Sequence, residues 1–330
     1  MPETPDPGPG LLGEQLRARL SAREDADTDV FRVCHGRGGT FPGLEDVFLD
    51  HYAGTLRLGL HGERDAAWVR ALSSELEAAT ANAAVDGAWL QWRERPGAPV
   101  EVLFGTPRPS LQGREDGLTY LLRPGELRNA GLFLDARPAR RWLRERARGA
   151  RVLNLFAYTC AFSLAALAGG AREVVNVDMA RSALETGQRN HALNDLRGAR
   201  FLPHDVWKSR GALRRRGPFD LVVLDPPTFQ RGSFEADRDW PRLLRRLGEL
   251  VRPGGQVLLL VNSPFLTVSR LETWRRELAP GFAVEARLGA STDFPERDPD
   301  RGLKVLVWRR SASGPAEDVE GDAAQAVRGA

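Results

Sequence analysis

Residues 151–178, RVLNLFAYTCAFSLAALAGGAREVVNVD, contain a strand, a helix and a second strand in direct succession. The runs Val152–Phe156 and Glu173–Val177 are short and rich in bulky or β-branched residues, as is typical of buried strands. The segment between them is mostly small and apolar and has a helical pattern. This order predicts two parallel strands that are joined by a crossover helix.

The same alternation continues toward the C-terminus. Further strand-like runs lie at Ala199–Leu202, Leu221–Leu224 and Gln256–Val261, and helical patterns separate them. Repeated strand–helix units of this kind predict a parallel sheet that is covered on both faces. We therefore expect residues 121–310 to form an α/β domain of the Rossmann-like, doubly wound type.

A different pattern precedes this domain. Residues 29–60 form short alternating runs that Gly and Pro interrupt, residues 65–81 have helical spacing, and strand-like runs return at 88–93 and 100–104. This predicts a small α+β domain over residues 11–120, which could contact RNA or only pack on the next domain. The two domains are joined within Leu111–Glu126. The end segments 1–10 and 311–330 are poor in bulky apolar residues, so we expect them to be disordered.

Composition excludes several classes of protein. The 47 Lys and Arg residues nearly balance the 44 Asp and Glu residues, and a net charge of +3 does not by itself indicate a polyanionic partner. Cys34 and Cys160 lack the spacing of a zinc site or a disulfide framework, which predicts no metal and a reducing, cytoplasmic location. No apolar run approaches the roughly 18 residues of a membrane span, so no membrane association is expected.

Candidate binding residues follow the strands, because ligands of such sheets bind at the carboxyl ends. The segment Asn154–Ser163 does not match GxGxxG, which argues against a dinucleotide. Asp178 directly follows the next strand and could accept hydrogen bonds from the ribose hydroxyls of a nucleoside cofactor, or it could cap a helix. Asp205 follows the third strand and could bind an adenine amino group or serve as a cap.

The segment Leu221–Phe229, LVVLDPPTF, is the most informative. Pro226 and Pro227 directly follow a buried strand, so they end its hydrogen bonding and fix the backbone. Backbone carbonyls and the ring of Phe229 are then held at the rim of the pocket, where they suit a planar base that carries an amino group. The alternative is that the prolines only terminate the strand.

These motifs resemble the bacterial 23S rRNA large-subunit methyltransferase family, whose enzymes depend on S-adenosylmethionine. The resemblance is carried by AGLFLDAR at 130–137, LNLFAYT at 153–159, GGAR at 169–172 with VDM at 177–179, and DPPTF at 225–229. The similarity is greater to the guanine-N7 methyltransferase moiety of the fused enzyme than to the cytosine-C5 branch. The segment HGRGGTFPGLE at 35–45 resembles the small domain that precedes the catalytic domain in this group.

The resemblance implies a set of functional residues. It assigns the binding of S-adenosylmethionine to Phe133, Asp135, Asn154, Phe156, Tyr158, Thr159, Cys160, Ser163, Asp178, Met179, Asp205, Val206 and Asp225. It assigns contact with the reacting base to Asp225, Pro226, Pro227 and Phe229. The sequence departs from the family at Cys160, where the family loop usually has glycine.

The cysteines also bear on the type of reaction. Methylation at carbon 5 of a pyrimidine requires a thiolate nucleophile, yet Thr228 follows Pro227, and the segment Val261–Pro264 contains no cysteine. A base nitrogen needs no covalent adduct. Either a ring nitrogen such as guanine N7 or an exocyclic amine fits, and Asn262 could orient the base or cap the segment that follows.

The sequence therefore predicts an S-adenosylmethionine-dependent methyltransferase that acts on a nitrogen of an RNA base, with guanine in 23S ribosomal RNA as the expected target. Candidate contacts to RNA phosphates are Arg37, Arg210, Arg214, Arg215 and Arg216. One alternative is a methyltransferase for a small molecule or a protein amide. The other is an RNA-binding protein with a decayed catalytic site. Whether the protein is a monomer or a homodimer stays open.

Overall fold

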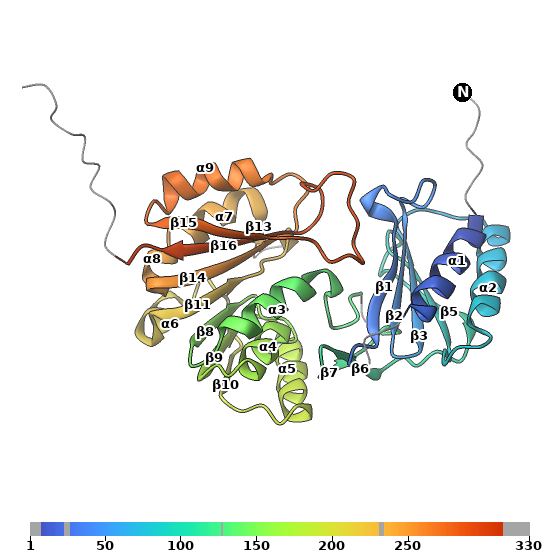
Figure 1. Ribbon diagram of the computed structural model, residues 1–330, viewed down its shortest axis with the longest axis horizontal. Helices are drawn as coiled ribbons and strands as arrows, with labels where there is room; N and C mark the ends of the chain where they lie inside the picture. The colour runs from blue at the N-terminus through green and yellow to red at the C-terminus, as the bar shows by residue number, and fades with distance from the viewer. Residues whose placement is uncertain (1–7, 23–26, 127, 231–233, 313–330) are drawn as a thin grey trace, which may run out of the picture.

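The structure is a computed structural model that describes residues 8–22, 27–126, 128–230 and 234–312. Its two main sheets lie side by side, the first built from the N-terminal part of the chain and the second from the remainder (Figure 1). The predicted α/β architecture is present. No helix of the described ranges is long and apolar enough to span a bilayer.

The first sheet has five strands in the order β1-β2-β3-β4-β5. Its strands are β1 (Val30–His35), β2 (Val47–Tyr52), β3 (Thr55–Leu60), β4 (Gly87–Trp92) and β5 (Val100–Gly105), and a 3-10 turn, η1 (Gly36–Gly38), follows β1. Helix α2 (Ala66–Thr80) connects the parallel pair β3 and β4, and Asp65 caps it by accepting from Trp68 N at 2.7 Å. The predicted helix and strands of this region are confirmed to within one or two residues.

Helix α1 (Gly8–Ser21) corrects the expectation that residues 1–10 are disordered, because Gly8, Pro9 and Gly10 belong to it. Its Leu12 and Leu16 are fully buried in the same apolar cluster as Leu72 of α2. Burial of these side chains offsets the entropy cost of ordering the segment. Residues 1–7 and 313–330 lie outside the described residues.

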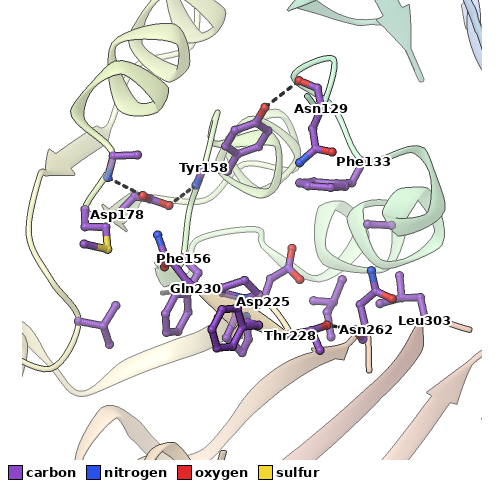
Figure 2. A pocket seen from close by; sticks show the side chains of 18 of the residues that line it. Asn129, Phe133, Phe156, Tyr158, Asp178, Asp225, Thr228, Gln230, Asn262 and Leu303 are labelled. Atoms are coloured by element: carbon purple, nitrogen blue, oxygen red, sulfur yellow. Dashed lines mark hydrogen bonds between the residues drawn. The ribbon is translucent and has the colours of Figure 1, made fainter. Parts of the chain in front are cut away.

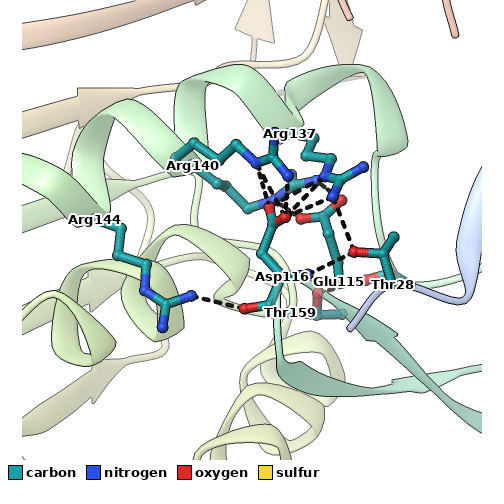
Figure 3. Close-up of polar contacts among 9 residues, drawn as sticks. Thr28, Glu115, Asp116, Arg137, Arg140, Arg144 and Thr159 are labelled. Atoms are coloured by element: carbon teal, nitrogen blue, oxygen red, sulfur yellow. Dashed lines mark hydrogen bonds and ion pairs between the residues drawn. The ribbon is translucent and has the colours of Figure 1, made fainter. Parts of the chain in front are cut away.

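A β-hairpin occupies the segment in which the sequence predicts the join between domains. Strands β6 (Leu111–Glu115) and β7 (Leu118–Leu122) are connected by Asp116 and Gly117, whose φ angles of 51° and 76° suit a tight hairpin turn. Figure 3 shows how its turn is fastened to α3 (Arg137–Arg146): Glu115 binds Arg140 at 2.6 Å, and Asp116 binds Arg137. The alternating charges of this segment therefore form ordered ion pairs.

The second sheet has seven strands in the order β10-β9-β8-β11-β14-β16-β15. They are β8 (Arg151–Leu155), β9 (Glu173–Val177), β10 (Ala199–Leu202), β11 (Phe219–Leu224), β14 (Val251–Val261), β15 (Phe282–Leu288) and β16 (Lys304–Arg310). The first five in this order are parallel, and β16 and β15 are added antiparallel at the edge. The five parallel strands are those expected from the sequence.

Helices cover both faces of this sheet (Figure 1). They are α3, α4 (Ala161–Ala168), α5 (Arg181–Leu193), α6 (Arg210–Arg216), α7 (Ala236–Leu244), α8 (Leu247–Leu250) and α9 (Val268–Leu278), with short strands β12 (Phe229–Gln230) and β13 (Phe234–Glu235) and the 3-10 turn η2 (Leu134–Ala136). The order of connection reverses between β8 and β11. Their carboxyl ends therefore flank the position at which doubly wound sheets bind ligands.

The segment between β15 and β16 reaches the first sheet. Arg297 N donates to Gly38 O at 2.8 Å, and His35 Nε2 lies 3.0 Å from Glu296 Oε1. Burial and the nearby Arg32 guanidinium lower the pKa of His35, although Glu296 opposes this shift. These contacts hold the first sheet next to the carboxyl ends of the second.

Candidate active site

A cavity of about 340 Å³ lies at the carboxyl ends of β8, β9, β10 and β11, a size suited to a small-molecule ligand. It is lined by Asn129, Phe133, Asp135, Ala136, Phe156, Tyr158, Asp178, Met179, Ala180, Asp205, Val206, Asp225, Pro226, Pro227, Thr228, Phe229, Gln230, Leu260, Asn262 and Leu303. We call it the main pocket. Figure 2 shows Asp178 on one side of it and Asn262 with Leu303 on the other, with Asp225 and Thr228 between them.

The loop after β8 forms the wall nearest the sheet and has an unusual backbone. Phe156, Tyr158 and Cys160 have φ angles of 59°, 48° and 65°, which place three non-glycine residues in the left-handed region. Each such residue costs about 1–3 kcal/mol and persists only where its surroundings hold it. Strained backbone of this kind concentrates at binding sites.

Asp178 holds this loop in place. One carboxylate oxygen accepts from Tyr158 N at 2.7 Å, and the other accepts from Ala180 N at 2.8 Å (Figure 2). Tyr158 is also fixed at its other end, because its hydroxyl donates to Asn129 O at 3.3 Å. Each oxygen of Asp178 has one more lone pair, so the carboxylate can accept from ligand hydroxyls while it orders the loop.

Four residues of the predicted cofactor set, Asn154, Thr159, Cys160 and Ser163, do not line the main pocket. Their side chains are all buried, and a role in binding the cofactor stays a prediction for them. Asn154 donates to Asn176 Oδ1 at 2.9 Å, and Ser163 lies 2.9 Å from His191 Nε2. Thr159 donates to Gly131 O at 2.6 Å. These side chains support the loop from behind.

The position of Cys160 explains why a glycine would be favoured there. Its left-handed backbone suits glycine, whereas its side chain is fully buried against Gly187. A Cβ atom at Gly187 would lie only 2.6 Å from Cys160 Sγ. The cysteine is thus accommodated because the facing helix α5 has no side chain at this point.

The rim of the main pocket is formed by the predicted segment Asp225–Phe229. Thr228 donates from its hydroxyl to Asn262 O, which joins the loop after β11 to the loop after β14. The ring of Phe229 is 68% exposed, so it is free to contact a ligand. Asp225 lies deeper, at the end of β11.

Two carboxyl groups of the main pocket, Asp225 and Asp135, have raised pKa values. Burial and the neighbouring Asp135 carboxylate raise the pKa of Asp225 to about 7, against the opposing charge of Arg140. Burial also raises the pKa of Asp135, and the charges of Arg32 and Arg140 act in the other direction. Asp225 is therefore close to the midpoint of its titration at neutral pH.

Comparison with known proteins agrees with this geometry. A family model described as S-adenosylmethionine-dependent methyltransferase matches residues 31–309. The chain belongs to this family. A ribosomal RNA large subunit methyltransferase K/L of Shewanella sp. (strain MR-4) is 34% identical to this methyltransferase over 229 residues, or 66% of this chain and 32% of the relative.

Two further proteins are similar. The ribosomal RNA large subunit methyltransferase of Deinococcus radiodurans is 34% identical over 240 residues, which are 69% of this chain and 56% of the relative. The crystal structure of SMU.776, a methyltransferase complexed with SAH, shares the fold with a TM-score of 0.78 at 24% identity, over 91% of this chain and 80% of that one. This chain thus spans less than two thirds of either curated relative.

The cofactor of the family is S-adenosylmethionine, and the main pocket can accommodate such a molecule. Asp178 offers acceptors for a ribose, and one carboxylate oxygen of Asp205 accepts from Trp207 N at 2.8 Å. Phe133 and Tyr158 also line the pocket, with their ring centroids 5.5 Å apart. The main pocket of this methyltransferase thus offers both hydrogen-bond acceptors and aromatic surface, which suit a nucleoside with an attached amino acid.

Sequence reasoning missed several lining residues of the methyltransferase, namely Asn129, Ala136, Ala180, Gln230, Leu260 and Leu303. Most of them are apolar or small and have no motif of their own. Of the predicted phosphate contacts, Arg37 lies close to the main pocket, in the adjoining cavity that also contains Asn129 and Asn262. Arg214–Arg216 end helix α6, which leads to the opposite, amino end of β11.

Proposed function

We propose that the protein transfers the methyl group of S-adenosylmethionine to a nitrogen of an RNA base, with guanine in 23S ribosomal RNA as the target. The observation that carries this proposal is the segment Asp225–Phe229. It places a carboxyl group with a pKa near neutrality inside the pocket and an exposed aromatic ring at its mouth. A base that enters the pocket can stack on this ring.

The proposed orientation of the cofactor follows from the acceptors. Asp178 accepts from the ribose hydroxyls, and Asp205 binds the adenine end with Val206 and Met179 beside it. Tyr158 and Phe133 would then hold the methionine end, and Asp225 would lie beside the base that accepts the methyl group. We assign direct roles to these lining residues and a supporting role to Asn154, Thr159, Cys160 and Ser163.

S-adenosylmethionine supplies an electrophilic methyl group, which the base nitrogen attacks with its lone pair as the carbon–sulfur bond breaks. Asp225 and the backbone carbonyls around Pro226 and Pro227 orient the base for this displacement. If the nitrogen is an exocyclic amine, its proton passes to the Asp225 carboxylate. If it is guanine N7, no proton is transferred, and Asp225 instead stabilises the cationic product.

The placement of the cysteines supports a nitrogen target. Neither Cys34 nor Cys160 lines the main pocket, and both are buried. Burial raises the pKa of the Cys34 thiol to about 12 and also raises that of Cys160 well above its usual value. Neither thiol is available as the nucleophile that methylation at carbon 5 needs.

The proposed substrate is supported by the names of the relatives, which are ribosomal RNA large subunit methyltransferases. We place the reaction in the cytoplasm, where ribosomal RNA is found. The test is incubation with methyl-labelled S-adenosylmethionine and deproteinised 23S rRNA, 16S rRNA or tRNA, followed by nucleoside mass spectrometry.

We expect label in 23S rRNA as a methylguanosine. N7-methylguanosine and N2-methylguanosine differ in retention and fragmentation, so the same experiment identifies the nitrogen. Label in 5-methylcytidine would contradict the nitrogen target. Label only in a protein or small-molecule fraction would contradict the RNA substrate, and absence of cofactor binding would favour an RNA-binding protein without catalytic activity.

A further inference from the structure

A second cavity of about 170 Å³ adjoins the main pocket and is lined by an excess of arginines. We call it the arginine pocket. Its five arginines are Arg32, Arg37, Arg57, Arg93 and Arg128. It shares Asn129, Phe133, Asp135 and Asn262 with the main pocket, so the two cavities are contiguous.

The first sheet supplies most of these arginines. Arg32 lies on β1, Arg57 on β3, and Arg93 directly follows β4. Arg37 lies in η1, next to the contact between Gly38 and the segment before β16. The fold therefore brings cations from separate strands to the side of the main pocket that faces the first sheet.

Few carboxylates are available to these cations. The acidic residues that line the arginine pocket are Asp50 and Asp135. Asp50 is engaged by Arg32, whose Nε and Nη2 donate to its two oxygens at 2.7 and 3.0 Å, and it also accepts from the Tyr52 hydroxyl at 3.2 Å. The nearest carboxylate is thus used by one arginine of the group.

Arg93 is held by neutral acceptors. It donates to Gln91 Oε1 at 3.0 Å and to Arg128 O, and Arg57 donates to the same two oxygens at 2.6 and 2.9 Å. Arg93 Nε is buried and has no hydrogen-bond partner among the described residues. Burial and the charges of the neighbouring arginines lower the pKa of Arg93 to about 10. Like charges are therefore held close together around this cavity.

Arg37 and Arg128 extend this positive surface toward solvent. Both side chains are exposed, and within the described part of the chain neither forms a hydrogen bond or an ion pair. An arginine fork matches the oxygens of a phosphate, and several forks around one cavity favour a multiply contacted anion.

We propose that the arginine pocket binds a backbone phosphate of the RNA next to the nucleotide whose base enters the main pocket. This inference rests on the proposed RNA substrate. Phosphate contacts set the position of a nucleic acid, whereas base contacts select the nucleotide. The first sheet thereby positions the substrate, and Asp225–Phe229 contacts the base.

The test compares two arginine-pocket variants with a control. Arg37→Gln/Arg128→Gln changes two exposed side chains at the mouth of the pocket, so folding should be unaffected, and Arg93→Gln removes the half-buried member. The matched control is Arg148→Gln, an exposed arginine just before β8, at the amino end of the parallel strands and therefore away from the pockets. Binding of labelled deproteinised 23S rRNA is measured over a series of NaCl concentrations, and binding of S-adenosylmethionine is measured by calorimetry.

For both arginine-pocket variants we expect the Kd for rRNA to rise at least about tenfold at low salt, while the control and the Kd for S-adenosylmethionine stay unchanged. The slope of log Kd against log salt should flatten by about 0.7 for each phosphate of a single strand that the variant no longer neutralises. The KM for rRNA should rise with little change in kcat.

Other outcomes would overturn the inference in distinguishable ways. If wild type methylates rRNA and the variants bind it with unchanged Kd and slope, the phosphate site is refuted while the proposed function stands. If the variants lose affinity for S-adenosylmethionine alone, the arginines bind the carboxylate of the cofactor instead. If wild type binds the cofactor but no rRNA, both proposals fail.

Discussion

Glu115→Gln should destabilise the protein by about 3–5 kcal/mol. Glu115, at the end of β6, and Arg140, in α3, are 2% and 3% exposed, and Arg140 Nε and Nη2 donate to the two carboxylate oxygens at 2.6 and 2.7 Å (Figure 3). The substitution keeps the shape of the side chain but leaves a buried guanidinium without its counter-charge. The cost of such an uncompensated charge gives the stated magnitude.

The assay is urea unfolding followed by circular dichroism. The control is Glu145→Gln, which removes an exposed ion pair of 3.0 Å with Arg146 and should change the free energy of unfolding by at most about 1 kcal/mol. Glu115→Met/Arg140→Met replaces both charges and should recover most of the loss. A change for Glu115→Gln no larger than that of the control would refute this account of how the hairpin is fastened to α3.

Three further predictions concern the main pocket and the loop behind it. The folded-state pKa of Asp225, about 7, lies above its ordinary value, so wild type loses the stability due to this group as pH rises from about 4 to 7. Over that range the free energy of unfolding of Asp225→Asn should therefore increase relative to that of wild type, and the difference should level off above pH 7. A difference that does not depend on pH would contradict this. Phe229→Ala removes a ring that is 68% exposed, so the free energy of unfolding should change by less than about 0.5 kcal/mol. Loss of base stacking worth about 1–3 kcal/mol should lower kcat/KM for rRNA by roughly 5- to 150-fold. Equal kcat/KM for variant and wild type would exclude stacking on this ring. Gly187→Ala should destabilise the protein by about 1–3 kcal/mol because the added Cβ would lie 2.6 Å from Cys160 Sγ. Adding Cys160→Gly to this variant should restore the stability, and thermal unfolding measures both effects. A lack of rescue would show that the clash lies elsewhere.

The sheet could be predicted from sequence because its strands are continuous apolar runs of limited length. Strands β9 and β10 have the predicted ends, and β11 and β14 begin earlier than predicted. Neither antiparallel strand was predicted. Strand β15 lacks an apolar run because its side chains are mostly exposed or half-buried, whereas β16 is a buried apolar run that the sequence analysis overlooked. Periodicity detects burial, and an edge strand has little of it.

Part of the pocket lining could be predicted because ligand-binding side chains follow the strands of such a sheet. Asp178 and Asp225 directly follow β9 and β11, Asp205 lies three residues after β10, and all three line the main pocket. Phe133 and Asp135 follow no strand, and only the family motif pointed to them. Asn154 instead lies within β8, in register with Asn176 of β9, to which it donates a hydrogen bond. Two asparagines at matching positions of adjacent parallel strands were a signal for such a buried pair.

Apart from Arg37, which the sequence analysis named as a phosphate contact, the arginine pocket could not be predicted because its members come from distant parts of the chain. Arg32, Arg57 and Arg93 are brought together by the pairing of strands in the first sheet, and Arg128 lies in the segment that leads to α3. Each looks like a solvated surface arginine in the sequence. Their proximity depends on the topology of the sheet and on its placement beside the main pocket.

The most direct test of the account is calorimetric titration of the protein and its Asp178→Ala variant with S-adenosylmethionine. Glu185→Ala, which removes an exposed carboxylate from the helix after Asp178, is the control. Wild type and control should bind alike, and Asp178→Ala should bind about 10- to 100-fold more weakly, as loss of hydrogen bonds to a charged group implies. Failure of wild type to bind, or equal binding by Asp178→Ala, would contradict the proposed cofactor site.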